Sequence, residues 1–224
     1  MRDKTIVITG AFGVLGRAAA DLAAQQGARV AMLDVKVSAQ SVTAPDLAIA
    51  VDLTDLKATT RAMQSVRAAT GAIDALLNIA GGFAWETVSD GDVATWERMF
   101  ALNLKTALTA SKAALPHLIE ARGAIVNVGA ASALKAEAGV GAYTASKQGV
   151  MKLTESLAAE LKGQVRVNAV LPSILDTPQN RTDMPMADPA KWVQPAELAH
   201  VMLFLASDEA SAVTGALVPV TGRV

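Results

Sequence analysis

The chain has 224 residues, a formal net charge of −1, 52% hydrophobic residues and no cysteine. This length favours one domain, residues 1–224, and the absence of cysteine excludes disulfides and thiolate metal sites. No Lys/Arg cluster marks a nucleic-acid footprint, and His117 and His200 lie too far apart in sequence to predict a metal site. The longest uncharged stretch, residues 210–222, is too short to span a bilayer. The start of the chain leaves no room for a signal peptide, so we expect a cytoplasmic protein without nucleic-acid or membrane partners.

The N-terminal segment predicts a strand, a glycine turn and a helix. Ile6 to Ile8 is a β-branched run typical of a buried strand, and residues 14–26 carry apolar side chains at helical spacing. The intervening glycines allow a tight turn and bring backbone N–H groups and a helix N-terminus to a pyrophosphate. We therefore expect a dinucleotide to bind the residues of this turn: Gly10, Phe12, Gly13, Val14, Leu15 and Gly16.

Asp34 follows a second predicted strand, residues 28–33, and lies 18 residues after Gly16. An acidic side chain at about this distance reaches the hydroxyls of the adenosine ribose and repels a 2′-phosphate. The sequence therefore predicts NAD(H) in preference to NADP(H), although Arg17 and Lys36 could soften that preference. The alternative is that Asp34 only ends a strand in a turn.

Strand and helix patterns alternate through the rest of the chain. We expect a loop at 35–45 and an irregular segment at 173–192 that is long enough to be a substrate lid. Such alternation requires right-handed crossovers, so we predict an α/β fold: a doubly wound parallel sheet of Rossmann type with helices on both faces. The further strands are expected at 47–51, 73–79, 124–128, 165–171 and 216–220, and the further helices at 54–70 with Thr54 as N-cap, 92–120, 141–161 and 195–207.

Tyr143 and Lys147 are four residues apart on a helical pattern and so share one face of the helix. A phenol has an ordinary pKa near 10, which makes it a poor acid–base group at neutral pH. A neighbouring ammonium stabilises the phenolate and lowers this pKa, which suits a general acid. The alternative is an ordinary pair on a surface helix, but Tyr143 is the only tyrosine in the chain.

Several further short motifs accompany these residues, namely Thr9-Gly10, Asp52-Leu53, Asn78-Ile79-Ala80-Gly81, Asn103, and Pro172 with Thr177. Together with the glycines, Asp34, Tyr143 and Lys147, they resemble the short-chain dehydrogenase/reductase family over nearly the whole chain. The resemblance implies that Tyr143 transfers the substrate proton, that Lys147 holds the nicotinamide ribose and lowers the pKa of the tyrosine, and that Asn103 keeps a water beside the lysine. It also implies cofactor contacts from Asp52 and Leu53 at the adenine, from Asn78, Ala80 and Gly81 along the cleft, and from Pro172 and Thr177, with Thr177 at the carboxamide. The alternatives are that Asn103 is a helix-surface amide and Asp52 a turn residue.

Two departures from the family pattern stand out. The usual serine after the fifth strand falls on Ala130, and Ser132 lies two residues later as a possible substitute; the usual Pro-Gly after the sixth strand is Pro172-Ser173. The absence of this serine is a feature shared with dihydropteridine reductase-like members of the family. The pattern of Ala80 to Ala84 and of residues 171–192 also resembles these members, whereas Asn103 does not match them. An apolar pocket for a flat ring is one interpretation of the following residues, and packing within the lid is the other: Phe83, Trp85, Met184, Met186 and Trp192.

The leading hypothesis is an NAD(H)-preferring oxidoreductase that transfers a hydride to or from a carbonyl or imine-like carbon of a small molecule, with Tyr143 as general acid/base. The alternatives are a quinonoid dihydropteridine reductase and a non-catalytic NAD(H)-binding redox sensor. The resemblance also implies a homodimer or homotetramer that pairs the helices at 92–120 and 143–161. An apolar stripe on the second helix agrees with such pairing, and core packing explains it equally well: Val150, Leu153, Leu157 and Leu161.

Overall fold

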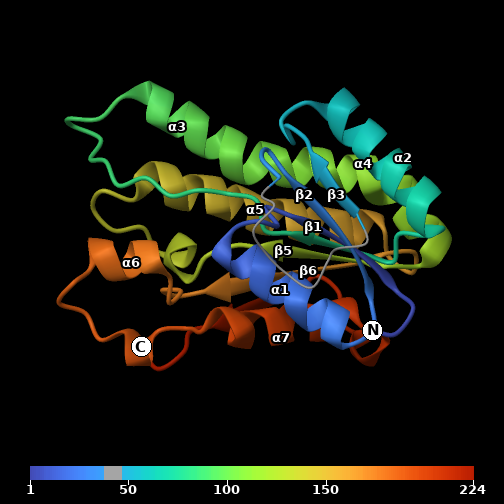
Figure 1. The fold of residues 1–224 in the computed structure, drawn as a ribbon. Coiled ribbons are helices and arrows are strands. Elements are labelled where there is room, and N and C mark those ends of the chain that lie inside the picture. Colours follow the sequence, from blue (N-terminus) through green and yellow to red (C-terminus); the bar gives the residue numbers. More distant parts are fainter. Residues whose placement is uncertain (38–46) are drawn as a thin grey trace.

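A computed structural model describes residues 1–37 and 47–224, and it contains a seven-stranded sheet (Figure 1). The strand order is β3-β2-β1-β4-β5-β6-β7, and every neighbouring pair is parallel. The predicted doubly wound sheet is therefore confirmed. Residues 38–45 of the predicted loop lie outside the described residues. The strands are β1 Thr5–Thr9, β2 Arg29–Asp34, β3 Leu47–Ala50, β4 Ala75–Asn78, β5 Ala124–Val128, β6 Arg166–Pro172 and β7 Leu217–Val220.

Helices cover both faces of the sheet (Figure 1). On one face, α1 (Val14–Gln25) packs against α7 (Pro195–Ala206). On the other face lie α2 (Leu56–Thr70), α4 (Thr106–Ala121) and α5 (Gly141–Glu160). Two shorter helices, α3 (Val93–Met99) and α6 (Pro178–Asp183), extend beyond the carboxyl ends of the strands. Among the described residues, no helix is long and apolar enough to cross a membrane.

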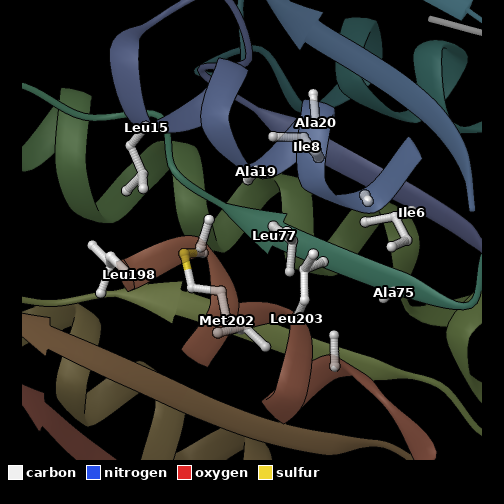
Figure 2. Close-up of a cluster of buried hydrophobic side chains, with 14 of the residues drawn as sticks. Ile6, Ile8, Leu15, Ala19, Ala20, Ala75, Leu77, Leu198, Met202 and Leu203 are labelled. Carbon is white, nitrogen blue, oxygen red and sulfur yellow. The ribbon is translucent and has the colours of Figure 1, made fainter. Parts of the chain in front are cut away.

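The core follows from the alternation of side chains along the strands. In β1, Ile6 and Ile8 join the cluster under α1 and α7, whereas Val7 joins the cluster under α2, α4 and α5. The first cluster is drawn in Figure 2, where Leu15 and Ala19 of α1 approach Leu198 and Met202 of α7 over the sheet. Both faces of the central strands are therefore apolar, as the continuous β-branched runs predict.

Helix packing also explains the apolar stripe on α5. Val150, Leu157 and Leu161 are buried within the chain itself, and the last two belong to the core cluster on that face. The core-packing interpretation of these three side chains is thus confirmed. The oligomeric state stays a prediction.

Two local predictions are wrong. The helix expected at 92–120 is interrupted by a π-helical segment, Phe100–Lys105, between α3 and α4. The N-cap of α2 is Asp55 instead of Thr54, because the Asp55 carboxylate accepts the amides of Lys57 and Ala58. The Thr54 hydroxyl instead donates to Asp52.

The segment at 173–192 is ordered in the structure. It contains α6 and a 3-10 turn, Pro189–Lys191, and a parallel bridge joins Leu175 to Val193. Trp192 closes the segment and is only 1% exposed. That this segment acts as a lid stays a prediction.

Candidate active site

A cleft of about 810 Å³ lies across the carboxyl ends of the strands. In this sheet the chain runs outward on both sides of the central strands β1 and β4, and such switch points are where open α/β sheets bind ligands. The cleft is lined by Gly10, Gly13, Val14, Leu15, Gly16, Asp34, Val35, Asp52, Leu53, Thr54, Ile79, Ala80, Gly81, Gly82, Phe83, Leu102, Thr106, Tyr143, Lys147, Leu175, Thr177, Pro178 and Gln179.

The glycine turn after β1 leaves room only for bare backbone. Gly10 has a φ of +61°, and a Cβ there would lie 2.7 Å from the Cα of Ala80. A Cβ on Gly16 would lie 2.3 Å from the carbonyl oxygen of Gly10. Helix α1 begins at this turn from Gly13 without a side-chain cap. This backbone cradle at a helix N-terminus fits the pyrophosphate of a dinucleotide.

Asp34 ends β2 beside the same turn and lines the cleft. Its Oδ2 accepts the amide of Phe12 at 3.1 Å, and its Oδ1 accepts the amide of Val35 at 2.7 Å. The carboxylate thus also positions the turn, and Phe12 takes part through its backbone while its side chain packs against the core. The Nε of Arg17 donates to the Phe12 carbonyl at 2.8 Å.

Asp52 lines the cleft just after β3, followed by Leu53 and Thr54. Its Oδ1 accepts the amide of Thr54 at 2.8 Å and the Thr54 hydroxyl at 2.7 Å. These hydrogen bonds lower the pKa of the Asp52 carboxyl below its usual value, and the bond from the Thr54 amide has the larger effect. Asp52 therefore lies at the cleft and also has the turn role of the alternative interpretation, and its contact with a cofactor stays a prediction.

Hydrogen bonds of Thr9 and Asn78 fix the position of the chain after β4. The Thr9 hydroxyl oxygen accepts the amides of Ile79 at 3.0 Å and Ala80 at 3.1 Å, so this backbone faces the cleft in a fixed position. Asn78 lies beneath it, buried, with its Nδ2 donating to Asn127 Oδ1 at 2.8 Å and to Ser111 Oγ at 3.0 Å. Asn78 supports the wall of the cleft and is not among the residues that line it.

Asn103 lies within the π-helical segment and is 1% exposed. Its Oδ1 accepts the Gly82 amide at 2.9 Å, and its Nδ2 donates to the Gly82 carbonyl at 3.1 Å and to Ser146 Oγ at 2.9 Å. A Cβ on Gly81 would lie 2.5 Å from Asn103 Oδ1 and 3.4 Å from Lys147 Nζ. The wider π-turn therefore places this amide behind the cleft wall and close to the lysine, so the helix-surface alternative is wrong.

Tyr143 and Lys147 both line the cleft from α5. Lys147 is 5% exposed, its Nζ donates to the Val128 carbonyl at 2.8 Å, and burial lowers its pKa to about 8. The Tyr143 ring meets Phe83 edge-on, with centroids 5.0 Å apart. Burial raises the pKa of Tyr143 to about 12. The predicted lowering of this pKa is therefore absent in the protein alone, because desolvation of the phenolate dominates.

The missing family serine is visible as a buried alanine. Ala130 is 3% exposed and lies in a small cluster against which Tyr143 packs. Ser132 lies on the 3-10 turn Ala131–Leu134, is exposed, and is outside the set of cleft residues. Pro172 ends β6, is buried and is not one of the residues that line the cleft, whereas Thr177 lines it. The structure thus brings Thr177, but not Ser132 or Pro172, to the cleft surface.

The predicted apolar pocket is only partly assembled. Phe83 lines the cleft, but Trp192 is in the protein core and Met186 is 96% exposed. Trp85 packs over Gly139, where an added Cβ would lie 2.2 Å from the indole. The structure therefore leaves Phe83 as the aromatic side chain that contacts the catalytic tyrosine of the hypothesis.

The sequence interpretation missed several cleft residues. Leu102 and Thr106 come from the π-helical segment and its junction with α4, and Leu175, Pro178 and Gln179 come from the irregular segment after β6. The proline at the first turn of α6, after a capping threonine, was the available signal for a helix there. The π-helix left no comparable signal.

Residues 4–187 match the family model of the short chain dehydrogenases. A meso-2,3-butanediol dehydrogenase of Serratia marcescens is 36% identical to this chain over an alignment of 235 residues including gaps. The alignment covers 98% of this chain and 94% of that protein. A ligand-free aldohexose dehydrogenase of Thermoplasma acidophilum superposes with a TM-score of 0.91 at 29% identity, covering 99% of this chain and 94% of the other. A carveol dehydrogenase of Mycobacterium avium in complex with NAD superposes with a TM-score of 0.88 at 26% identity, covering 99% and 97%.

The chain therefore belongs to the short-chain dehydrogenase/reductase family and is an enzyme of this dehydrogenase and reductase type. Membership supports a nicotinamide cofactor and a small-molecule substrate.

Proposed function

We propose that this protein is an NAD(H)-preferring oxidoreductase that transfers a hydride to or from a carbonyl or imine-like carbon, with Tyr143 as general acid/base. One observation carries the proposal: Tyr143 and Lys147 line the same cleft as the glycine turn and Asp34. A single extended dinucleotide then contacts the turn at its pyrophosphate and reaches the tyrosine with its nicotinamide. When bound, this cofactor supplies or accepts the hydride.

The proton is handled by α5. At neutral pH a phenol with a pKa of about 12 is protonated, so Tyr143 is ready to donate its proton as a substrate is reduced. Lys147, with a pKa of about 8, is mostly an ammonium at pH 7 and favours the phenolate that this donation leaves. Asn103 is hydrogen-bonded both to the Gly82 backbone and to Ser146 of α5. It thereby fixes α5, which carries Tyr143 and Lys147, relative to the wall of the cleft.

Preference for NAD(H) is supported by Asp34. Its carboxylate already accepts two backbone amides, so it is fixed at the end of β2 and faces the cleft. A 2′-phosphate there would meet this negative charge, whereas ribose hydroxyls can donate to it. Replacing Asp34 with serine should therefore narrow the ratio of kcat/KM for NADH over NADPH.

The test is NADH oxidation with a panel of ketones, aldehydes and a quinonoid dihydropterin, compared between the wild type and Tyr143→Phe. We expect turnover on at least one carbonyl compound, a loss in kcat on the order of 10²–10⁴ in the variant, and an unchanged Kd for NADH. Unchanged turnover in Tyr143→Phe would refute the mechanism. NADH binding without turnover on any substrate would favour the sensor, and turnover of the pterin alone would favour the reductase alternative.

The predicted homodimer or homotetramer remains a proposal and is independent of this chemistry. Sedimentation of a species with the mass of one chain would reject it.

A further inference from the structure

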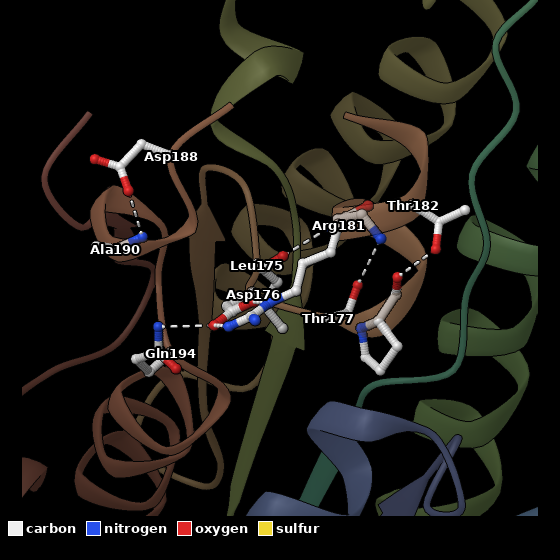
Figure 3. A network of polar contacts seen from close by, with 10 residues as sticks. Leu175, Asp176, Thr177, Arg181, Thr182, Asp188, Ala190 and Gln194 are labelled. Atoms are coloured by element: carbon white, nitrogen blue, oxygen red, sulfur yellow. Dashed lines mark hydrogen bonds and ion pairs between the residues drawn. The ribbon is translucent and has the colours of Figure 1, made fainter. Parts of the chain in front are cut away.

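A single carboxylate, that of Asp176, joins the segment after β6 to the start of α7 (Figure 3). Its side chain is 9% exposed. Oδ1 accepts Arg181 Nε at 2.6 Å, and Oδ2 accepts Arg181 Nη2 at 2.8 Å and Gln194 Nε2 at 3.1 Å. Arg181 belongs to α6, and Gln194 is the N-cap of α7. The carboxylate therefore ties α6 to the N-terminus of α7.

The α7 end of this connection is rigid. Leu198 and Met202 bury α7 in the core with no exposed area. The Gln194 amide donates to Glu197 Oε2 at 2.9 Å, which closes a capping box, and Glu197 Oε1 accepts Arg223 Nη2 at 2.6 Å. The Asp176 amide also donates to the Val193 carbonyl at 2.9 Å. Asp176 is thus fixed to a helix that cannot shift without opening the core.

Helix α6, in contrast, has no buried side chains that would fix its position. It has six residues, and none of them is buried. Isolated helices of this length are unstable in water, so contacts outside the helix decide its position. Besides Asp176, the Thr177 hydroxyl accepts the Asn180 amide at 3.1 Å, and Asn180 Nδ2 donates to the Leu175 carbonyl at 2.7 Å. These two bonds are local to the segment, and only the Asp176 carboxylate links α6 to α7 through side chains described here.

The residues next to Asp176 form one end of the cleft. Thr177, Pro178 and Gln179 line it, as does Tyr143. Asp34 lines the cleft from β2, and β6 lies four strand positions away from β2 in the sheet. Four strand spacings amount to roughly 19 Å. A dinucleotide whose adenosine lay at Asp34 and which extended along the cleft would therefore bring its reacting end to the start of α6.

We propose that Asp176 is a positioning residue that holds the N-terminal turn of α6, with Thr177, against the nicotinamide half of the bound cofactor. The inference rests on the proposed function, since it assumes a dinucleotide in this orientation. The Arg181 side chain keeps the pKa of Asp176 at about 2, so the connection stays charged at neutral pH.

The test compares Asp176→Asn with Asp188→Asn, a matched control in the same segment whose carboxylate only caps the 3-10 turn through the Ala190 amide. Calorimetry would measure the Kd of NADH and of ADP-ribose, which lacks the nicotinamide. If α6 takes its present position about a tenth of the time in Asp176→Asn, the Kd of NADH rises about tenfold. The Kd of ADP-ribose should stay within about twofold, because the glycine turn and Asp34 are untouched. Hydrogen exchange should quicken at residues 177–184 and not in α2.

Arg181→Gln removes the partner that is itself 59% exposed and should reproduce a smaller rise without a risk to folding. An unchanged Kd for NADH in both variants would overturn the inference alone, and so would an equal loss of NADH and ADP-ribose binding, which indicates a general structural role. An effect of Asp188→Asn as large as that of Asp176→Asn would also overturn it. A wild-type protein that binds neither ligand would overturn the proposed function together with the inference.

Discussion

Replacing Lys147 with methionine should change how the stability of the protein depends on pH. Burial lowers the pKa of this lysine from 10.5 to about 8, a shift that corresponds to about 3 kcal/mol. Between pH 8 and 10.5 the unfolded chain holds this proton and the folded chain does not, so the free energy of unfolding rises with pH across that window. Below pH 8 both states are protonated, and the full cost of the buried charge is present.

Urea unfolding of the cofactor-free protein at pH 7, 8, 9 and 9.5 measures this effect. We expect Lys147→Met to be more stable than the wild type at pH 7 by up to about 3 kcal/mol, less the lost hydrogen bond to the Val128 carbonyl, and the difference to shrink as pH rises. The series stops below pH 10 because the raised pKa of Tyr143 removes stability above that value. Lys152→Met, on the exposed side of α5, is the control. Parallel pH profiles for the wild type and Lys147→Met would refute the reasoning.

Three further substitutions probe other parts of the molecule. Gly16→Ala places a Cβ 2.3 Å from the Gly10 carbonyl oxygen, so thermal unfolding should show a loss of about 1–3 kcal/mol, and NADH titration a Kd raised by more than about tenfold; normal NADH affinity would contradict the cradle. Arg166→Met removes the guanidinium that donates to four backbone carbonyls at the end of α7 and just after it. Urea unfolding should therefore show a loss of about 2–4 kcal/mol in the free energy of unfolding. The value of kcat should not change, because Arg166 lies at the opposite end of β6 from the cleft. Ala130→Ser adds a hydroxyl in the cluster beside Tyr143, and kcat/KM for ketone reduction should rise by up to about tenfold; an unchanged or lower value would show that the chemistry does not use this position.

The sheet, its order and the cleft at its carboxyl edge follow from patterns that a single sequence displays. Continuous apolar runs, glycines at fixed intervals and acidic residues at strand ends reflect local requirements. These patterns select Gly10, Asp34 and Asp52, and all three line the cleft in the structure. The same holds for Tyr143 and Lys147, whose common helix face is set by their spacing alone.

The remaining features depend on tertiary packing, which sequence periodicity does not encode. An aromatic side chain such as that of Trp192 suits an apolar pocket, yet Trp192 is buried in the core. It lies next to Val193, which forms a bridge with Leu175. Asn103 lies on a π-turn that leaves the helical pattern intact on both sides. The pKa of Tyr143 is raised because the phenol is buried, and the spacing of two residues does not show how deeply either side chain is buried.

The all-parallel order of the sheet also sets a demand on biosynthesis. The central strand β1 is synthesised before its partner β4, which begins at Ala75, paired with Ile6. At typical elongation rates of about 5–20 residues per second, roughly 4–14 s pass before that edge of β1 can be covered. During this interval an apolar strand remains open to pairing with other chains. Yield of folded enzyme should therefore respond to chaperone supply and growth temperature more than to small changes in final stability.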